Sequence, residues 1–295
     1  MLPMHRAGTI AIVGRPNVGK SSLLNCLVGQ KVSITSRRAQ TTRHRVLGIV
    51  TRPAVQLVFV DTPGLQARHG SELNRRMNRA ATQAMSDVDV VLLVVEALRF
   101  GSQDRHVLAL LPAGTPTVVA VNKSDLVKDR DALLPFLSTL SAAHPFAALV
   151  PVSARNGRQT EELLQALAAL LPEGPPLYGA DEITDRSERV LAAELLREKL
   201  FRLLGEELPY GAAVQIERFE LEGGLRRIAA TVLVDRPSHR PIVIGKRGEK
   251  LKAIATQARV DMEKLFGGKV FLEVWVKVEE GWMDDRALLE RLGYD

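Results

Sequence analysis

An eight-residue loop near the N-terminus constrains the fold of this chain more than any other feature. It reads Gly-Arg-Pro-Asn-Val-Gly-Lys-Ser over residues 14–21, directly after the apolar run 9–13 and directly before a stretch of helical composition. Glycines let the backbone N–H groups of such a loop wrap around phosphates, and the N-terminus of the following helix adds positive potential. The pattern therefore predicts a strand, a phosphate-binding loop and a helix, in that order.

The side chains at the end of this loop suit a nucleoside triphosphate. Lys20 can reach the β- and γ-phosphates, and the Ser21 hydroxyl can bind Mg²⁺. The loop alone does not distinguish ATP from GTP. The other residues expected to contact the nucleotide here are Gly14, Asn17, Val18, Gly19 and Ser22.

Four further apolar runs follow, separated by stretches of helical length. Each is short, rich in β-branched residues and continuously apolar, as a strand buried on both faces should be. This alternation predicts an α/β fold of the P-loop NTPase type, with a doubly wound, mostly parallel sheet that binds ligands at the carboxyl ends of its strands. The four runs cover residues 57–60, 89–95, 117–121 and 149–152.

Guanine specificity is indicated where two of these runs end. Asp125, in an Asn-Lys-Ser-Asp sequence, offers two oxygens that match the N–H and NH₂ donors on the guanine edge, whereas adenine lacks that donor pair. Asn122 is expected to brace the loop, and the stem of Lys123 to cover the base. After the next run, Ser153 and Ala154 place a backbone N–H where it can meet the guanine oxygen.

Two segments between these motifs are expected to respond to the γ-phosphate. Asp61 can hold Mg²⁺ through water, and the Gly64 N–H can sense the γ-phosphate. A second Mg²⁺ ligand should come from residues 40–44, where we favour Thr42 over Thr41, although the spacing does not decide between them. The expected catalytic residues are therefore Lys20, Thr42, Asp61 and Gly64.

The catalytic set lacks a residue that positions water. In Ras-like enzymes a Gln follows the Asp-x-x-Gly motif, but here the position holds Leu65, which cannot orient water. We therefore expect slow intrinsic hydrolysis. Arginines at 37, 38, 43 and 45 surround the 40–44 segment, and both a solvated basic loop and a contact with ribosomal RNA account for them.

A second domain is expected, since 295 residues are about twice the usual domain size. The Pro- and Gly-rich segment 172–180 ends the alternation and is typical of a short, stiff linker. We assign residues 1–175 to a GTP-binding domain, 176–184 to the linker and 185–295 to a smaller α+β domain. The net charge is +8 over the first 180 residues and −2 over the rest, so total charge does not mark the second domain as a binder of nucleic acid.

The predicted order of elements in the second domain matches a type II KH domain. We expect a helix, two strands, a brief helix before Gly245, a longer helix and a last strand. The ranges are 185–204 for the first helix, 212–221 and 226–234 for the strands, 249–266 for the longer helix and 270–278 for the last strand.

A Gly-x-x-Gly loop joins the two middle helices of this domain. Glycine at both ends lets a sugar-phosphate backbone approach closely, and the Lys and Arg between them attract phosphate. Residues 236–252 hold six basic residues and one acid, which supports an RNA-binding surface, although an ordinary helix-helix turn is the alternative. The candidate RNA-binding residues are Ile244, Gly245, Lys246, Arg247, Gly248 and Lys250.

Other residue types exclude several kinds of site. Trp275 and Trp282 could stack on bases, but we favour core packing for both because large apolar fillers are scarce in this chain. Cys26 and the six His show no metal-ligand spacing, so we expect no metal beyond the nucleotide's Mg²⁺ and a K⁺ considered below. A single Cys and the lack of an apolar run near the roughly 20 residues of a membrane span predict a cytoplasmic protein.

Taken in order, these motifs resemble the bacterial Era GTPases over essentially the whole chain. Further matching stretches are 183–186, 197–200, 207–210 and 274–278. The resemblance implies GTP hydrolysis, binding near the 3′ end of small-subunit ribosomal RNA, a role in maturing that subunit, and peripheral association with the inner face of the plasma membrane. The central Lys-Arg pair of the Gly-x-x-Gly loop differs from other members, so fine RNA preference does not transfer. We also expect a monomer.

Asn17 in its Pro-Asn setting, like Leu65, also matches this family. The resemblance suggests that Asn17 binds a K⁺ ion where an arginine finger would sit, and a purely structural Asn in a turn is the alternative. The expected mechanism is that GTP and Mg²⁺ order the loops of Thr42 and Asp61, which changes how the second domain is presented to RNA. The rival interpretations are a membrane or trafficking switch and a structural component of the ribosome that uses nucleotide only for folding.

Overall fold

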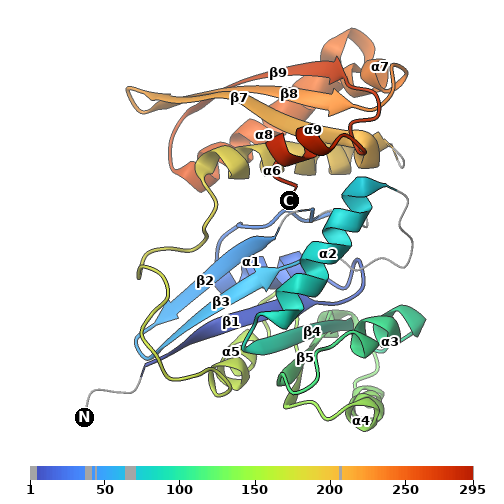
Figure 1. Ribbon diagram of the computed structural model, residues 1–295, viewed down its shortest axis with the longest axis vertical. Coiled ribbons are helices and arrows are strands. Elements are labelled where there is room, and N and C mark those ends of the chain that lie inside the picture. Colours follow the sequence, from blue (N-terminus) through green and yellow to red (C-terminus); the bar gives the residue numbers. More distant parts are fainter. Residues whose placement is uncertain (1–4, 37–41, 44, 64–70, 206–207, 295) are drawn as a thin grey trace. The chain divides into compact units, whose positions relative to one another are not determined.

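The computed structural model describes residues 5–36, 42–43, 45–63, 71–205 and 208–294 (Figure 1). Contacts divide the chain into two compact units. The first holds residues 1–33, 42–67 and 77–185, and the second holds 34–41, 68–76 and 186–295. Two short segments from the N-terminal half, described at 34–36 and 71–76, therefore group with the C-terminal residues.

The first unit is built on a six-stranded sheet with the order β2-β3-β1-β4-β5-β6. Strand β2 pairs antiparallel with β3, and the other four pairings are parallel, which confirms the predicted mostly parallel α/β fold. The strands are β1 (Arg6–Val13), β2 (Val46–Arg52), β3 (Val55–Asp61), β4 (Val90–Glu96), β5 (Thr117–Asn122) and β6 (Ala148–Pro151).

Helices cover both faces of this sheet. Alternate strand residues such as Ile10 and Leu92 pack with α1 and α5, while neighbours such as Val91 pack with α2, α3 and α4. Burial on both faces is why the strands are continuously apolar. The helices are α1 (Lys20–Val28), α2 (Glu72–Ser86), α3 (Ser102–Ala109), α4 (Leu133–Ala143) and α5 (Thr160–Ala168), with a 3-10 turn η1 (Ser124–Leu126).

The second unit has the order of elements expected for a type II KH domain. Its sheet runs β7-β8-β9, with β7 and β8 antiparallel and β8 and β9 parallel. The last helix was not predicted from the sequence. The elements are α6 (Glu188–Leu203), η2 (Leu208–Gly211), β7 (Ala212–Glu222), β8 (Leu225–Val234), α7 (His239–Ile244), η3 (Lys246–Gly248), α8 (Glu249–Phe266), β9 (Val270–Val278) and α9 (Arg286–Arg291).

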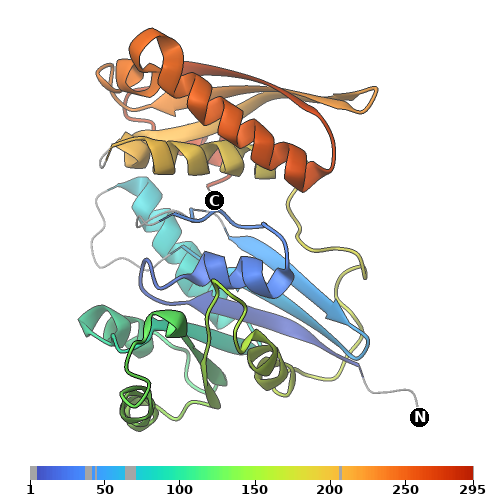
Figure 2. The ribbon, with the colours of Figure 1, turned by 180° about the vertical axis from the view of Figure 1, so that it is seen from behind.

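Helices α6 and α8 lie side by side along one face of this three-stranded sheet (Figure 2). Their apolar side chains, among them Leu196 and Ile254, pack on inward-facing strand residues such as Val232. None of the helices in the described residues is both long enough and apolar enough to cross a membrane.

The two tryptophans differ in their surroundings. Trp282 is fully buried, and its indole nitrogen donates to the Gly211 carbonyl at 3.0 Å, which confirms core packing for this residue. Trp275 is 51% exposed, so the same expectation was wrong there. The neighbours Val274 and Val276 point into the core, and strand alternation therefore turns Trp275 to the opposite face of the sheet.

Candidate functional site

The phosphate loop lies between the end of β1 and the start of α1, as the sequence predicts. Gly14 has a φ of +151°, and a Cβ there would lie 2.4 Å from the Val94 carbonyl oxygen. Gly19 has a φ of +100°, and a Cβ there would lie 2.4 Å from Asn122 Nδ2. That amide nitrogen donates to the Val18 carbonyl at 2.9 Å. The glycines thus allow the guanine-specificity motif to brace the phosphate loop directly.

Asn17 is exposed at the tip of this loop and has a φ of 65°. Asn adopts this left-handed conformation more readily than most residues, so the geometry accounts for an Asn here without any ion. Ser22 is also exposed, one residue after Ser21, in the first turn of α1.

Lys20 is buried against the loop it closes. Its ammonium donates to the carbonyls of Gly14 at 2.9 Å and Arg15 at 3.1 Å. Burial lowers the pKa of Lys20 to about 8, although the nearby Asp61 acts in the opposite direction. An anion placed in the loop would favour the charged form of Lys20, as a phosphate site requires.

The predicted Mg²⁺ ligands come together beside Lys20. Ser21 Oγ donates to Asp61 Oδ2 at 2.8 Å and lies 2.8 Å from Thr42 Oγ1. Asp61 is fully buried, and its second oxygen, Oδ1, has no partner among the described residues. Burial raises the pKa of Asp61, opposed chiefly by Lys20. Two hydroxyls around a buried carboxylate with an unsatisfied oxygen fit a hard cation.

Ser33 also belongs to this cluster, although the sequence did not predict it. Ser33 Oγ donates to Asp61 Oδ2 at 2.9 Å, and the hydroxyl is buried. A serine in a connecting segment carries no motif, so no sequence signal marks it. The expected contributions of Gly64, Thr41 and Leu65 fall on residues outside those the structure describes.

The residues predicted to select guanine also converge. Asp125 Oδ1 accepts a hydrogen bond from Ser153 Oγ at 2.7 Å, which fixes the carboxylate. Asn122 Oδ1 accepts from the Ala154 N–H at 3.0 Å, so that backbone donor is engaged within the protein. Lys123 has a φ of 63°, in the left-handed region. The structure thus joins the two loops after β5 and β6 directly.

A carboxylate at the end of β4, which was not predicted from the sequence, joins these loops to the phosphate loop. Glu96 Oε2 accepts from Lys123 Nζ at 2.9 Å and from Arg15 at 3.3 Å. Arg15 also pairs with Asp104 at 3.2 Å. Burial alone would raise the pKa of Glu96, but the hydrogen bond and charge of Lys123, with Arg99 and Arg15, hold it below the usual value.

In the second unit, the Gly-x-x-Gly loop lies between α7 and α8. Gly245 has a φ of +74°, and a Cβ there would lie 2.6 Å from Lys250 Cβ, so only glycine fits. Gly248 has a φ of +80° and immediately precedes the 18-residue α8. Lys246 and Arg247 are exposed, while Ile244 and Lys250 are partly buried. Two exposed basic side chains therefore lie at the N-terminus of a long helix, which attracts anions.

Two family models match the chain, one in each unit. A model described as 50S ribosome-binding GTPase matches residues 9–123. A model described as KH domain matches residues 207–283. The first match covers the phosphate loop and ends inside the guanine-specificity motif, and the second contains the whole Gly-x-x-Gly loop.

Full-length relatives have both units. The chain is 57% identical over 291 residues to GTPase Era of Nitrosomonas eutropha, covering 99% of this chain and 98% of the relative. It is 55% identical over 293 residues to GTPase Era of Chromobacterium violaceum, covering 99% of each chain.

Two solved structures match with a TM-score of 0.94 and 38% identity, covering 98% of this chain and 99% of theirs. One is a point variant of Aquifex aeolicus Era bound to GDP and AlF₄⁻. The other is Era in complex with MgGDPNP and nucleotides 1506–1542 of 16S ribosomal RNA.

Proposed function

Because this chain belongs to the Era family of GTPases, we propose that it binds small-subunit ribosomal RNA near its 3′ end and assists maturation of the small ribosomal subunit. The chain binds guanine nucleotides and hydrolyses GTP. One observation carries the RNA proposal: the relative solved with nucleotides 1506–1542 of 16S ribosomal RNA is similar to this chain along 98% of its length.

Phosphate chemistry is assigned to the cluster around Asp61. We assign charge neutralisation at the phosphates to Lys20, and Mg²⁺ ligation to Ser21, Thr42 and, through water, Asp61. Bound Mg²⁺ neutralises the charge that develops on the phosphoryl oxygens. The Gly64 N–H is assigned to sensing the γ-phosphate. The loop residues assigned to the nucleotide are Gly14, Asn17, Val18, Gly19 and Ser22.

Base recognition is assigned to the loops after β5 and β6. The Asp125 carboxylate accepts from the guanine edge, and Ser153 orients that carboxylate, as their 2.7 Å hydrogen bond supports. Asn122 braces the phosphate loop and the Ala154 backbone, which holds the base loop in register. The Lys123 stem covers the base.

The RNA contact is assigned to the loop between α7 and α8. Gly245 and Gly248 let an RNA backbone approach, and the exposed Lys246 and Arg247 neutralise its phosphates. Ile244 and Lys250 complete the surface. We divide the chain functionally into residues 1–175 for GTP, a linker at 176–184, and 185–295 for RNA.

The switch itself is a coupling between these sites. GTP with Mg²⁺ orders Thr42 and Asp61, RNA affinity changes, and hydrolysis reverses the change. Such coupling requires a different RNA affinity in each nucleotide state. The family resemblance extends the proposal to a K⁺ ion on Asn17, a monomer and peripheral contact with the inner face of the plasma membrane.

The test is a pair of binding titrations with an RNA that contains the 3′ end of the small-subunit ribosomal RNA. We expect the affinity to differ at least fivefold, on the order of typical allosteric couplings, between GDP and a non-hydrolysable GTP analogue. A scrambled RNA of equal length serves as the control. Equal affinity for both RNAs in both nucleotide states would count against the proposed function.

A further inference from the structure

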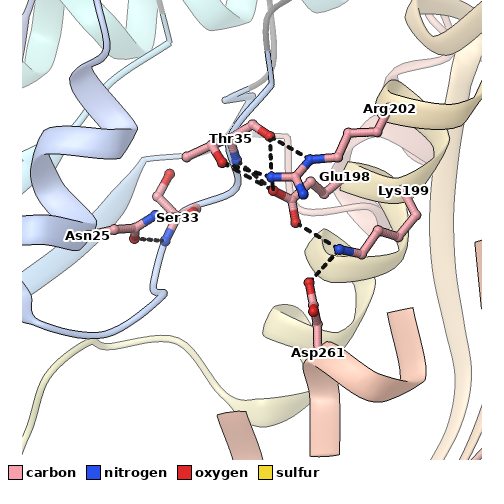
Figure 3. Close-up of polar contacts among 7 residues, drawn as sticks. All are labelled: Asn25, Ser33, Thr35, Glu198, Lys199, Arg202 and Asp261. Atoms are coloured by element: carbon pink, nitrogen blue, oxygen red, sulfur yellow. Dashed lines mark hydrogen bonds and ion pairs between the residues drawn. The ribbon is translucent and has the colours of Figure 1, made fainter. Parts of the chain in front are cut away.

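Thr35 is bound by helix α6 through all three of its polar atoms (Figure 3). Glu198 Oε1 accepts from the Thr35 backbone N–H and from its hydroxyl, each at 3.2 Å. Arg202 Nη2 donates to the Thr35 carbonyl at 3.2 Å and to the hydroxyl at 3.1 Å. Helix α6 thus recognises this single residue with one carboxylate and one guanidinium.

The Glu198 carboxylate, which accepts the hydrogen bonds from Thr35, is buried within a polar network. The Glu198 side chain is 0% exposed, and it pairs with Lys199 at 3.7 Å and Arg202 at 2.5 Å. Lys199 in turn bonds Asp261 on α8, the helix that begins directly after the Gly-x-x-Gly loop. A buried carboxylate is costly unless its oxygens are paired, so the donors from Thr35 are part of what stabilises Glu198.

Two residues earlier, Ser33 belongs to the first unit and is held there firmly. Asn25 Oδ1 accepts from the Ser33 N–H at 2.9 Å, and Asn25 Nδ2 donates to the Ser33 carbonyl at 2.7 Å (Figure 3). The Ser33 hydroxyl donates to Asp61. Two peptide units span at most about 7 Å, so the position of Ser33 limits where Thr35 can lie.

We propose that Glu198 and Arg202 are positioning residues for the nucleotide site, acting through Thr35. A cation held through water at the open Oδ1 of Asp61 would shift the carboxylate that Ser33 bonds through Oδ2, and the short connection from Ser33 to Thr35 would carry that shift to α6. By linkage, RNA that stabilises this arrangement of α6 and α8 strengthens binding of GTP over GDP. This last step rests on the proposed function, while the positioning role itself does not.

A second segment shows the same pattern independently. The first turn of α2, which follows the Asp61 motif along the chain, is also held by C-terminal residues. The Glu72 N–H donates to Asp284 Oδ1 at 2.8 Å, and Arg76 donates to the Tyr294 carbonyl at 2.6 Å. The described parts of both segments, 34–36 and 71–76, thus group with C-terminal residues in the second unit.

The experiment uses the full chain and replaces Arg202→Ala or Thr35→Val. Arg202 is 45% exposed, and Lys199 and Thr35 still pair with Glu198 after its loss, so the chain should still fold. We expect each variant to bind a non-hydrolysable GTP analogue with Mg²⁺ about three- to tenfold more weakly, with the Kd for GDP within twofold of wild type. Hydrogen exchange of the peptide over 33–36 should become faster in the analogue-bound state.

Two further variants serve as matched controls. Thr35→Ser keeps both the hydroxyl and the N–H and should restore the wild-type ratio of GTP-analogue to GDP affinity. Arg259→Ala removes an arginine of similar exposure, 38%, that pairs with Glu263 on its own helix, and should change nothing.

Separate readouts distinguish this inference from the proposed function. If the RNA affinity of the wild type does not depend on the bound nucleotide, the proposed switch fails. The ratio of GTP-analogue to GDP affinity and the hydrogen-exchange rate of residues 33–36 still decide the role of Thr35. If Arg202→Ala and Thr35→Val keep both the wild-type ratio and the wild-type exchange, the positioning role is overturned. If Thr35→Val does not fold, Arg202→Ala decides alone.

Discussion

The ammonium of Lys123 and the carboxylate of Glu96 lie 2.9 Å apart, and Arg15 of the phosphate loop donates to the same carboxylate oxygen. One side chain thereby ties Lys123, which we assign to covering the base, to the predicted phosphate loop. Glu96 is only 12% exposed, so these charges are poorly screened.

Replacing Glu96→Gln should therefore weaken nucleotide binding. Hydrogen bonds to charged groups are worth about 1.5–3 kcal/mol, so the Kd for GDP, measured by calorimetry, should rise by about tenfold or more. Arg99→Ala is the matched control, because Arg99 pairs with the same carboxylate from a 73% exposed position. A Glu96→Gln protein with wild-type affinity would show that this bridge is incidental.

Guanine preference should depend on Asp125. Asp125→Asn should lower GTP affinity by about a hundredfold or more, because the guanine donors lose their carboxylate, and should improve binding of xanthosine triphosphate. Ser153→Ala leaves Asp125 in place without its 2.7 Å partner and should cost about tenfold. Competition titrations measure both. ATP competing on equal terms with GTP in the wild type would contradict the assignment.

Nucleotide affinity should fall with pH above about 8. Lys20 has a pKa of about 8 in the free protein, below its ordinary 10.5. Phosphate favours the charged form, so binding takes up a proton once the pH exceeds 8, and affinity drops by up to about tenfold per pH unit. Calorimetry at pH 8.5 in buffers of different ionisation enthalpy should detect that proton. Lys20→Met should abolish it, and the exposed Lys128→Met should not.

Hydrolysis should be faster in K⁺ than in Na⁺. An arginine finger is worth about 10³–10⁵ in rate, so a cation in its place should give at least about a tenfold difference. Asn17→Ala should remove the difference between the two salts while leaving slow turnover. Equal wild-type rates in both salts would leave Asn17 as a turn residue, which its φ of 65° already accommodates.

RNA binding should depend on Lys246 and Arg247. Replacing both with Ala should weaken binding and lower the slope of log K against log salt concentration by about 1.4, if both contact phosphates of a single strand. Arg218→Ala, an exposed arginine on β7, is the control. An unchanged salt slope would place the RNA contact elsewhere.

Much of the fold followed from local sequence rules. The bounds of α8 and β9 agree with their predicted ranges because Gly248 and Gly267 adopt left-handed conformations at the two ends of the helix. Strand β2 was missed, since its apolar run is broken by Gly48. A Cβ at Gly48 would lie 2.4 Å from a Leu24 methyl, so the glycine lets α1 approach the sheet.

The site was predictable wherever a motif stands in one stretch of sequence. Lys20, Ser21, Asp61 and Asp125 each lie in such a stretch, and the structure brings them to the expected ends of the strands. Ser33, Glu96 and Glu198 could not be found this way, because their partners are distant in sequence. A lone Ser or Glu looks the same whether it is solvated or bonded across the fold. Core packing was predicted for Trp275 because tryptophan is large and apolar. The alternation of side chains along β9 instead places Trp275 on the face of the sheet opposite to Val274 and Val276.

Burial of Trp282 bears on how the chain acquires its fold during synthesis. Trp282, Leu289 and Tyr294 are all buried within the second unit, and the indole closes onto Gly211 at the start of β7. Domains generally fold as units, N-terminal first, as they emerge from the ribosome. The nucleotide-binding unit can become compact once residue 185 has emerged, whereas the KH fold must wait more than a hundred residues longer. A truncated product that ends before Trp282 would leave apolar side chains of the second unit exposed. Such a product would become a substrate for chaperones and proteases.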